Sequence, residues 1–145
     1  MNNNRLHLAF PVHDLELSKD FYIKVLSCKL GRESNKWADF NLYGHQLVAH
    51  LSPEDCNNHK LNIVDGDQIP SFHFGLILEW DEWEKLYKNL KSIKMKFLIN
   101  PKIRFQNQSG EQGTFFIKDP SGNVIEFKSF KDFNCIFTKQ EIKNV

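Results

Sequence analysis

The sequence has three side chains of the kinds that bind divalent metal ions on its expected strands: His7, His73 and Glu126. Two imidazoles and one carboxylate make a facial triad that suits non-haem Fe(II), because three coordination positions stay open for substrate and oxygen. Near pH 7 neutral imidazole and ionised carboxylate both donate to a divalent ion. The set predicts a metal centre if the fold brings the three side chains together.

An internal repeat relates the two histidines. The stretch "HLAFPVHDLELSKDFY" from His7 aligns with "HFGLILEWDEWEKLYK" from His73, and each copy begins as a strand and continues as an amphipathic helix. We expect the first helix to start after Asp14. The second helix has Asp81 as its expected N-cap, with Glu84 three residues later as in a capping box.

Further strands are expected after each helix. They cover about 29–33, 37–43 and 45–51 in the first copy, and about 95–99, 112–118 and 123–129 in the second. The last two are joined by Asp119-Pro120-Ser121-Gly122, residues typical of a tight turn. The loop 100–111, between the strands expected at about 95–99 and 112–118, is long enough to be functional or mobile.

The predicted fold class is α+β, with two tandem βαβββ modules whose curved mixed sheets form a metal- or ligand-binding cleft. We expect a single domain over residues 1–145. Module one covers about 5–52 and module two about 72–130. A polar linker of about 53–71 joins them, and no structure is predicted for the tail of about 131–145.

Strand alternation decides which side chains face the cleft. Successive side chains of a strand point to opposite faces. His7 and His73 therefore face away from the bulky residues that pack on the helices, and each stands next to small neighbours. Glu126 lies opposite the apolar set of its own strand, and His50 shares the outward face of its strand. Two sheets that curl toward each other would bring these faces into one cavity.

Plainer interpretations compete with the metal centre. A strand histidine is often a hydrogen-bonded surface or core residue, and a strand glutamate beside Lys128 is often only solvated. We expect His45, which adjoins the Gly44 turn, to be exposed. We expect His13, at the end of the first strand, to have only a local structural role. His59 lies in the polar linker and is expected to be solvated.

Composition excludes several classes of function. The formal net charge is +1 and no Lys/Arg block occurs, so nothing favours a nucleic-acid partner. No run approaches the ~18 apolar residues of a membrane span, and no signal peptide is evident. The three cysteines are odd in number and widely spaced, which favours a reducing compartment. We expect a cytoplasmic protein without membrane contact.

The segments "HLAFPVHDL", "YGHQLVAHLSP", "HFGLILEWDEW" and "DPSGNVIEFKSF" resemble the vicinal oxygen chelate superfamily, and the resemblance covers about residues 5–130. That superfamily includes glyoxalase I, type I extradiol dioxygenases, fosfomycin-resistance thiol transferases and bleomycin-binding proteins. More narrowly, these segments resemble small single-domain proteins described as predicted extradiol-dioxygenase relatives.

The resemblance implies a metal site at His7, His73 and Glu126 that holds Fe(II), with Mn(II), Ni(II) or Zn(II) as alternatives. It implies an oxidoreductase that opens a catechol-like aromatic diol with O2. A histidine or tyrosine that moves protons is expected near the metal. Strand parity makes His50 the candidate catalytic residue.

Further expectations assign substrate contacts to Tyr43 and Arg104. Glyoxalase I commonly supplies a second carboxylate from its first module, but counting from the turn glycines puts Val48 there. This disfavours a glyoxalase-type isomerase without excluding it. A non-catalytic small-molecule binding or resistance protein, and a partner-binding protein with a vestigial site, stay open as alternatives. The modules can pair within one chain or across a homodimer.

Overall fold

The computed structural model of the chain describes residues 3–57 and 60–139, so His59 and the end of the tail lie outside the described residues. Contacts divide the chain into two compact units. The first unit comprises Met1–Phe72 and Lys118–Val124, and the second comprises His73–Ile117 and Ile125–Val145.

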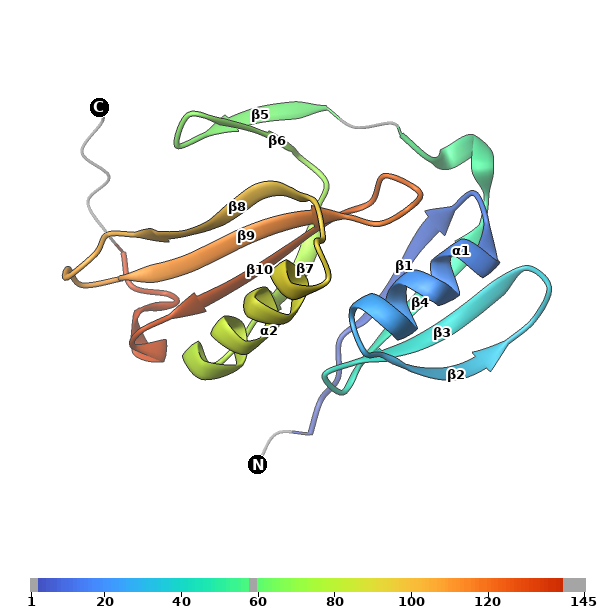
Figure 1. Cartoon of the computed structure of the whole chain (residues 1–145), viewed down its shortest axis with the longest axis horizontal. Helices are drawn as coiled ribbons and strands as arrows, with labels where there is room; N and C mark the ends of the chain where they lie inside the picture. Colours follow the sequence, from blue (N-terminus) through green and yellow to red (C-terminus); the bar gives the residue numbers. More distant parts are fainter. Residues whose placement is uncertain (1–2, 58–59, 140–145) are drawn as a thin grey trace. The chain divides into compact units, whose positions relative to one another are not determined.

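The first unit follows the predicted βαβββ order (Figure 1). Its elements are β1 (His7–Val12), α1 (Leu15–Asp20), the π-helical turn η1 (Phe21–Val25), β2 (Lys29–Glu33), β3 (Trp37–Leu42) and β4 (His45–Leu51). The sheet order is β1-β4-β3-β2, with β1 parallel to β4 and the other pairs antiparallel. α1 packs on this sheet, against β3 and β4.

The first helix begins where the sequence predicts. Asp14 is its N-cap and accepts a hydrogen bond of 2.9 Å from the Leu17 amide. The chain then continues into η1, which buries Tyr22 completely. The Tyr22 ring stacks on Phe40 of β3, with ring centroids 4.9 Å apart, and also lies against Phe10 of β1. These aromatic contacts join the helix to its sheet.

The second unit repeats the same order. Its elements are β7 (Phe74–Ile77), α2 (Trp80–Ser92), β8 (Phe97–Arg104), β9 (Gln112–Lys118), β10 (Val124–Phe130) and the 3-10 turn η3 (Phe133–Cys135). The sheet order is β7-β10-β9-β8, with β7 parallel to β10. On α2, Trp83 is buried and donates its indole N–H to the Phe127 carbonyl at 3.0 Å. The predicted α+β fold of paired βαβββ modules is confirmed.

The predicted start of α2 is wrong by half a turn. The helix begins at Trp80, and its N-cap, Glu79, makes no side-chain capping hydrogen bond. Asp81 thus lies inside the first turn of the helix, so the capping box centred on it does not form. Glu84 instead accepts a hydrogen bond of 3.2 Å from the Trp80 indole one turn earlier.

Two predicted irregular segments contain strands. The linker holds the 3-10 turn η2 (Pro53–Asp55) and a separate hairpin of β5 (Leu61–Val64) and β6 (Asp67–Pro70). β8 begins two residues later than expected and extends to Arg104, so the long loop shortens to 105–111. Strand alternation groups Leu51 with Leu47 and Ala49, which are buried, but Leu51 is exposed at the end of β4.

The predicted tight turn before β10 forms and is tied into the first unit. The Gly122 amide donates to the Asp119 carbonyl at 3.1 Å, and Gly122 has φ +83°, a left-handed conformation that glycine adopts without strain. The buried Asp119 carboxylate accepts four hydrogen bonds, from the amides of Ser121 and Asn123, the Asn123 side chain and the Tyr22 hydroxyl. Asn123 also donates to the Pro11 carbonyl of β1.

Cys28 is predicted to be inert to alkylation in the native protein. Burial raises the pKa of its thiol to about 12, and all three cysteines are free. At pH 8 a thiol of that pKa is ionised on the order of one part in ten thousand, and the thiolate is the reactive form. Peptide mapping after brief iodoacetamide treatment should show Cys135, which is half-buried, labelled well before Cys28. Equal labelling rates without denaturant would contradict this burial.

Within the described parts of the chain, no helix is both long and apolar enough to cross a membrane.

Candidate metal centre

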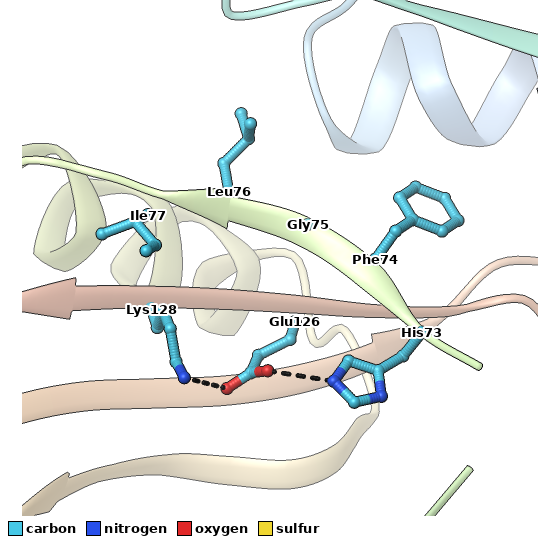
Figure 2. A pocket seen from close by; sticks show the side chains of 7 residues that line it. All are labelled: His73, Phe74, Gly75, Leu76, Ile77, Glu126 and Lys128. Carbon is cyan, nitrogen blue, oxygen red and sulfur yellow. Dashed lines mark ion pairs between the residues drawn. The ribbon is translucent and has the colours of Figure 1, made fainter. Parts of the chain in front are cut away.

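In the second unit the side chains of His73 and Glu126 meet. His73 Nε2 lies 3.3 Å from Glu126 Oε2 (Figure 2). His73 immediately precedes β7, and Glu126 is central in β10, which runs parallel beside it with Gly75 paired to Glu126. A Cβ atom at Gly75 would overlap the Glu126 carbonyl oxygen. Glycine at this position therefore permits the close approach of the two strands that carry the pair.

The other oxygen of Glu126 is held by two further side chains. Thr114 of β9 donates its hydroxyl to Oε1 at 2.8 Å, and Lys128 Nζ lies 3.4 Å from the same atom. The Glu126 side chain is only 15% exposed. The His73 ring packs edge-on to Phe116, with ring centroids 5.4 Å apart. Both members of the pair are thus oriented by their neighbours before any ligand binds.

His73, Glu126 and Lys128 line a cavity of about 220 Å³. Its lining consists of His73, Phe74, Gly75, Leu76, Ile77, Glu126 and Lys128. Figure 2 shows His73, Glu126 and Lys128 on one side of β7, while Phe74 and Leu76 point to the other side. The cavity is small beside the roughly 300–1,000 Å³ of sites for drug-sized ligands. By itself it accommodates an ion and a small ligand.

In the first unit His7 has a different partner. His7 pairs with Gln46 across the parallel strands β1 and β4, and its Nδ1 lies 2.7 Å from Gln46 Oε1. Gln46 Nε2 in turn donates to Asp39 Oδ2 at 3.1 Å, and Arg32 Nε reaches the same oxygen at 3.4 Å. His7 itself is exposed, whereas Asp39 is buried.

The geometry of the second-unit pair fits two adjacent ligands of one ion. Metal–nitrogen and metal–oxygen bonds of about 2.0–2.2 Å place neighbouring donors roughly 3.0–3.5 Å apart, and the observed separation is 3.3 Å. The described residues include no group of three or more His, Cys, Asp or Glu side chains placed to hold an ion. His7 belongs to the other unit. The three-residue ligand set therefore stays a prediction.

The remaining predicted site residues are distributed over both units. His50 is exposed on β4, paired with Trp37 of β3. Tyr43 occupies the turn between β3 and β4 with φ 49° and is 45% exposed. Arg104 is half-buried at the end of β8 and is not among the described residues that line the 220 Å³ cavity. Their assigned roles stay predictions.

Sequence reasoning missed Thr114, which donates to Glu126, and Asp39, which accepts from the Gln46 side chain next to His7. Each is a buried polar residue in a strand that is otherwise largely apolar. A buried polar side chain needs a hydrogen-bonding partner. A polar residue within a largely apolar strand therefore indicates that another polar group lies opposite it.

The sequence profile of the Glyoxalase/Bleomycin resistance protein/Dioxygenase superfamily matches residues 5–127. The chain belongs to this superfamily. The resemblance to the vicinal oxygen chelate proteins is thereby confirmed. Members of this superfamily commonly bind divalent metal ions and act on small molecules, and they often form dimers.

Individual members of the superfamily are similar to this chain to different degrees. The metallothiol transferase FosB of Lysinibacillus sphaericus is 28% identical over 121 residues, which are 83% of this chain and 78% of that protein. A glyoxalase/bleomycin resistance protein/dioxygenase from Alicyclobacillus acidocaldarius superposes with a TM-score of 0.76 at 33% identity, over 94% of this chain and 98% of that one.

A fosfomycin resistance protein, FosX, from Listeria monocytogenes shares the fold, with a TM-score of 0.65 at 13% identity over 93% of this chain and 98% of that one. These similarities support the superfamily and its fold. They do not distinguish a ring-cleaving dioxygenase from the thiol transferases and glyoxalase-like proteins.

Proposed function

We propose that this chain is a metal-dependent enzyme that acts on a small, oxygen-bearing substrate, with His7, His73 and Glu126 as the metal ligands. The observation that carries the proposal is the His73–Glu126 pair, 3.3 Å apart beside a cavity and already oriented by Thr114. A bound divalent ion would act as a Lewis acid on a substrate oxygen, and Fe(II) would also bring O2 beside the substrate.

The chain's own residues define what such a substrate must look like. Lys128 lines the same cavity as Glu126 and is 31% exposed, so its ammonium group can pair with an anionic oxygen of a ligand. Thr114 keeps the Glu126 carboxylate turned toward His73. An anionic or readily ionised oxygen compound is the substrate class that this lining favours.

The first candidate reaction is the O2-dependent opening of a catechol-like ring with Fe(II) or Mn(II). Two histidines and one glutamate leave three positions for diol and oxygen, and the narrower sequence resemblance is to extradiol-type proteins. In this proposal His50 moves protons, and Tyr43 and Arg104 contact the substrate. A catecholate also supplies the anionic oxygens that Lys128 favours.

The second candidate is metal-dependent transfer of a thiol to a small electrophile. The similarity to the metallothiol transferase FosB over 83% of this chain favours it. The same ligand set and Lys128 would serve this reaction. A glyoxalase-type isomerase is less favoured, because Val48 stands where a second carboxylate is needed.

Metal content tests the proposal directly. Protein purified without oxygen and without an affinity tag should contain near one equivalent of Fe or Mn. His7→Ala and His73→Ala should each lose it, because each removes a ligand, and His50→Ala is the matched control that should retain it. Elemental analysis by mass spectrometry gives the measurement. Absence of metal in the wild type after Fe(II) reconstitution would overturn the proposal and favour a non-catalytic binding protein.

Two assays then separate the reactions. Oxygen uptake with a panel of catechols reports ring opening, and loss of free thiol in the presence of an epoxide reports thiol transfer. His50→Ala should keep its metal but lose most of the oxygen uptake if His50 moves protons. Unchanged uptake in that variant would remove His50 from the site.

A further inference from the structure

The hydrogen bond between His7 and Gln46 has a defined direction. The two residues lie opposite each other on the parallel strands β1 and β4, and the contact joins His7 Nδ1 to Gln46 Oε1 at 2.7 Å. An amide oxygen only accepts hydrogen bonds. The hydrogen must therefore sit on His7 Nδ1.

Asp39 determines which end of the Gln46 amide faces His7. Asp39 is buried, and an ionised carboxylate in such a place needs hydrogen-bond donors. Gln46 Nε2 supplies one donor at 3.1 Å and Arg32 Nε supplies another at 3.4 Å, both to Oδ2. Reversing the Gln46 amide would bring its oxygen against the carboxylate and its NH2 group to His7. The buried charge therefore keeps the amide oxygen toward the histidine.

We propose that Asp39 and Gln46 are positioning residues that hold His7 in the Nδ1–H tautomer and leave the lone pair of its Nε2 for a metal ion. A ligating histidine commonly donates its other ring N–H to a fixed acceptor, which sets the ring orientation and the tautomer. The metal part of this inference rests on the proposed function, whereas the tautomer does not. His73, the counterpart of His7 in the repeat, uses Nε2 toward Glu126 instead.

The tautomer can be read in the metal-free protein. Nitrogen-15 NMR of the histidine rings, with His7 assigned by comparison with His7→Ala, should show Nδ1 protonated and Nε2 unprotonated in the wild type above the titration range of the ring. In Asp39→Asn the Gln46 amide can adopt either orientation, so a mixture of tautomers is expected. In Gln46→Leu the acceptor is absent, and the same mixture is expected.

A double variant moves the negative charge from position 39 to position 46 and keeps the chain of hydrogen bonds that ends at His7. In Asp39→Asn/Gln46→Glu the amide introduced at position 39 donates to the carboxylate introduced at position 46, and that carboxylate accepts from His7 Nδ1. The Nδ1–H tautomer should return although both side chains have changed, and the net charge equals that of the wild type. A purely structural role for the two residues would not produce this recovery.

Metal affinity gives the second measurement. Titration with Co2+, followed by its visible absorption, should show binding about 10–100-fold weaker in Gln46→Leu and Asp39→Asn than in the wild type. The double variant should recover most of the loss. Gln68→Leu, the same substitution at an exposed position of β6, should bind as the wild type does. Thermal unfolding of each variant confirms that it is folded. If Gln46→Leu does not fold, the Asp39→Asn variant and the double variant decide.

The inference is overturned if wild-type His7 carries its hydrogen on Nε2, or if the single variants keep both the tautomer and the Co2+ affinity of the wild type. Failure of the proposed function looks different. In that case the wild type binds no Co2+ at His7, while the NMR experiment still reports the tautomer.

Discussion

Replacing Glu126 by glutamine should lower the affinity for a divalent metal ion by well over 100-fold while the protein stays folded. Glutamine has nearly the same shape and keeps an oxygen that can accept from the Thr114 hydroxyl. It is neutral, however, and neutral amides are weak ligands for such an ion compared with carboxylates. Changes to residues behind a ligand cost about 10–100-fold, so loss of the ligand itself should exceed that range.

Titration with Co2+ and thermal unfolding, both performed on the same preparation, measure this effect. Glu82→Gln is the matched control, because Glu82 is an exposed carboxylate in the first turn of α2. Equal affinity in Glu126→Gln and Glu82→Gln would mean that Glu126 is an ordinary strand carboxylate. Loss of folding in Glu126→Gln would instead assign it a structural role alongside Lys128.

Asp119→Ala should lower the free energy of unfolding by about 3 kcal/mol at pH 7. The substitution leaves the buried Tyr22 hydroxyl and the Asn123 side chain without their acceptor, and each buried unsatisfied group costs about 1–3 kcal/mol. Asn123 retains the Pro11 carbonyl, which limits the loss. Urea unfolding gives the measurement. Asp81→Ala, at an exposed site in the first turn of α2, should change stability by less than about 0.5 kcal/mol.

The effect of Asp119 should depend on pH in a defined direction. Burial raises the pKa of its carboxyl above 3.8, and this outweighs the hydrogen bonds that favour the charged form. The folded state therefore binds a proton at a higher pH than the unfolded state does. The resulting stabilisation of the folded state is complete below pH 3.8. It is lost as the pH rises through the raised pKa of Asp119. The gap in unfolding free energy between wild type and Asp119→Ala should thus widen from pH 7 to pH 4, and a narrowing gap would contradict the raised pKa.

The fold was predictable because the repeat and the strand period are local properties of the sequence. Apolar residues of β1 and β10 alternate as expected, which placed Glu126 correctly opposite the buried Ile125 and Phe127. The β5–β6 hairpin was missed although its signal was present. Asp65-Gly66 joins the two strands with both residues at positive φ, the pattern of a two-residue hairpin turn. The polar composition of the linker led to the prediction of an irregular segment there.

The site was predictable only in part. Parity can assign His73 and Glu126 to one face, but their separation depends on the register of β7 against β10 and on the room that Gly75 leaves. The contact between His7 and Gln46 likewise depends on the register of β1 against β4. Pairing between strands distant in sequence has no local signature, so these partners emerge only from the fold.

The Asp119 turn belongs to the first unit although it lies in the second half of the sequence, so the chain cannot be cut between its halves without losing contacts. Residues 118–124 belong to the first unit, whereas most of β9 and β10 on either side of them belongs to the second. A polypeptide that ended at Phe72 would lack the acceptor for the Tyr22 hydroxyl and the donor to the Pro11 carbonyl. Each half carries a complete copy of the repeat, yet the first half depends on residues 118–124 for these two hydrogen bonds.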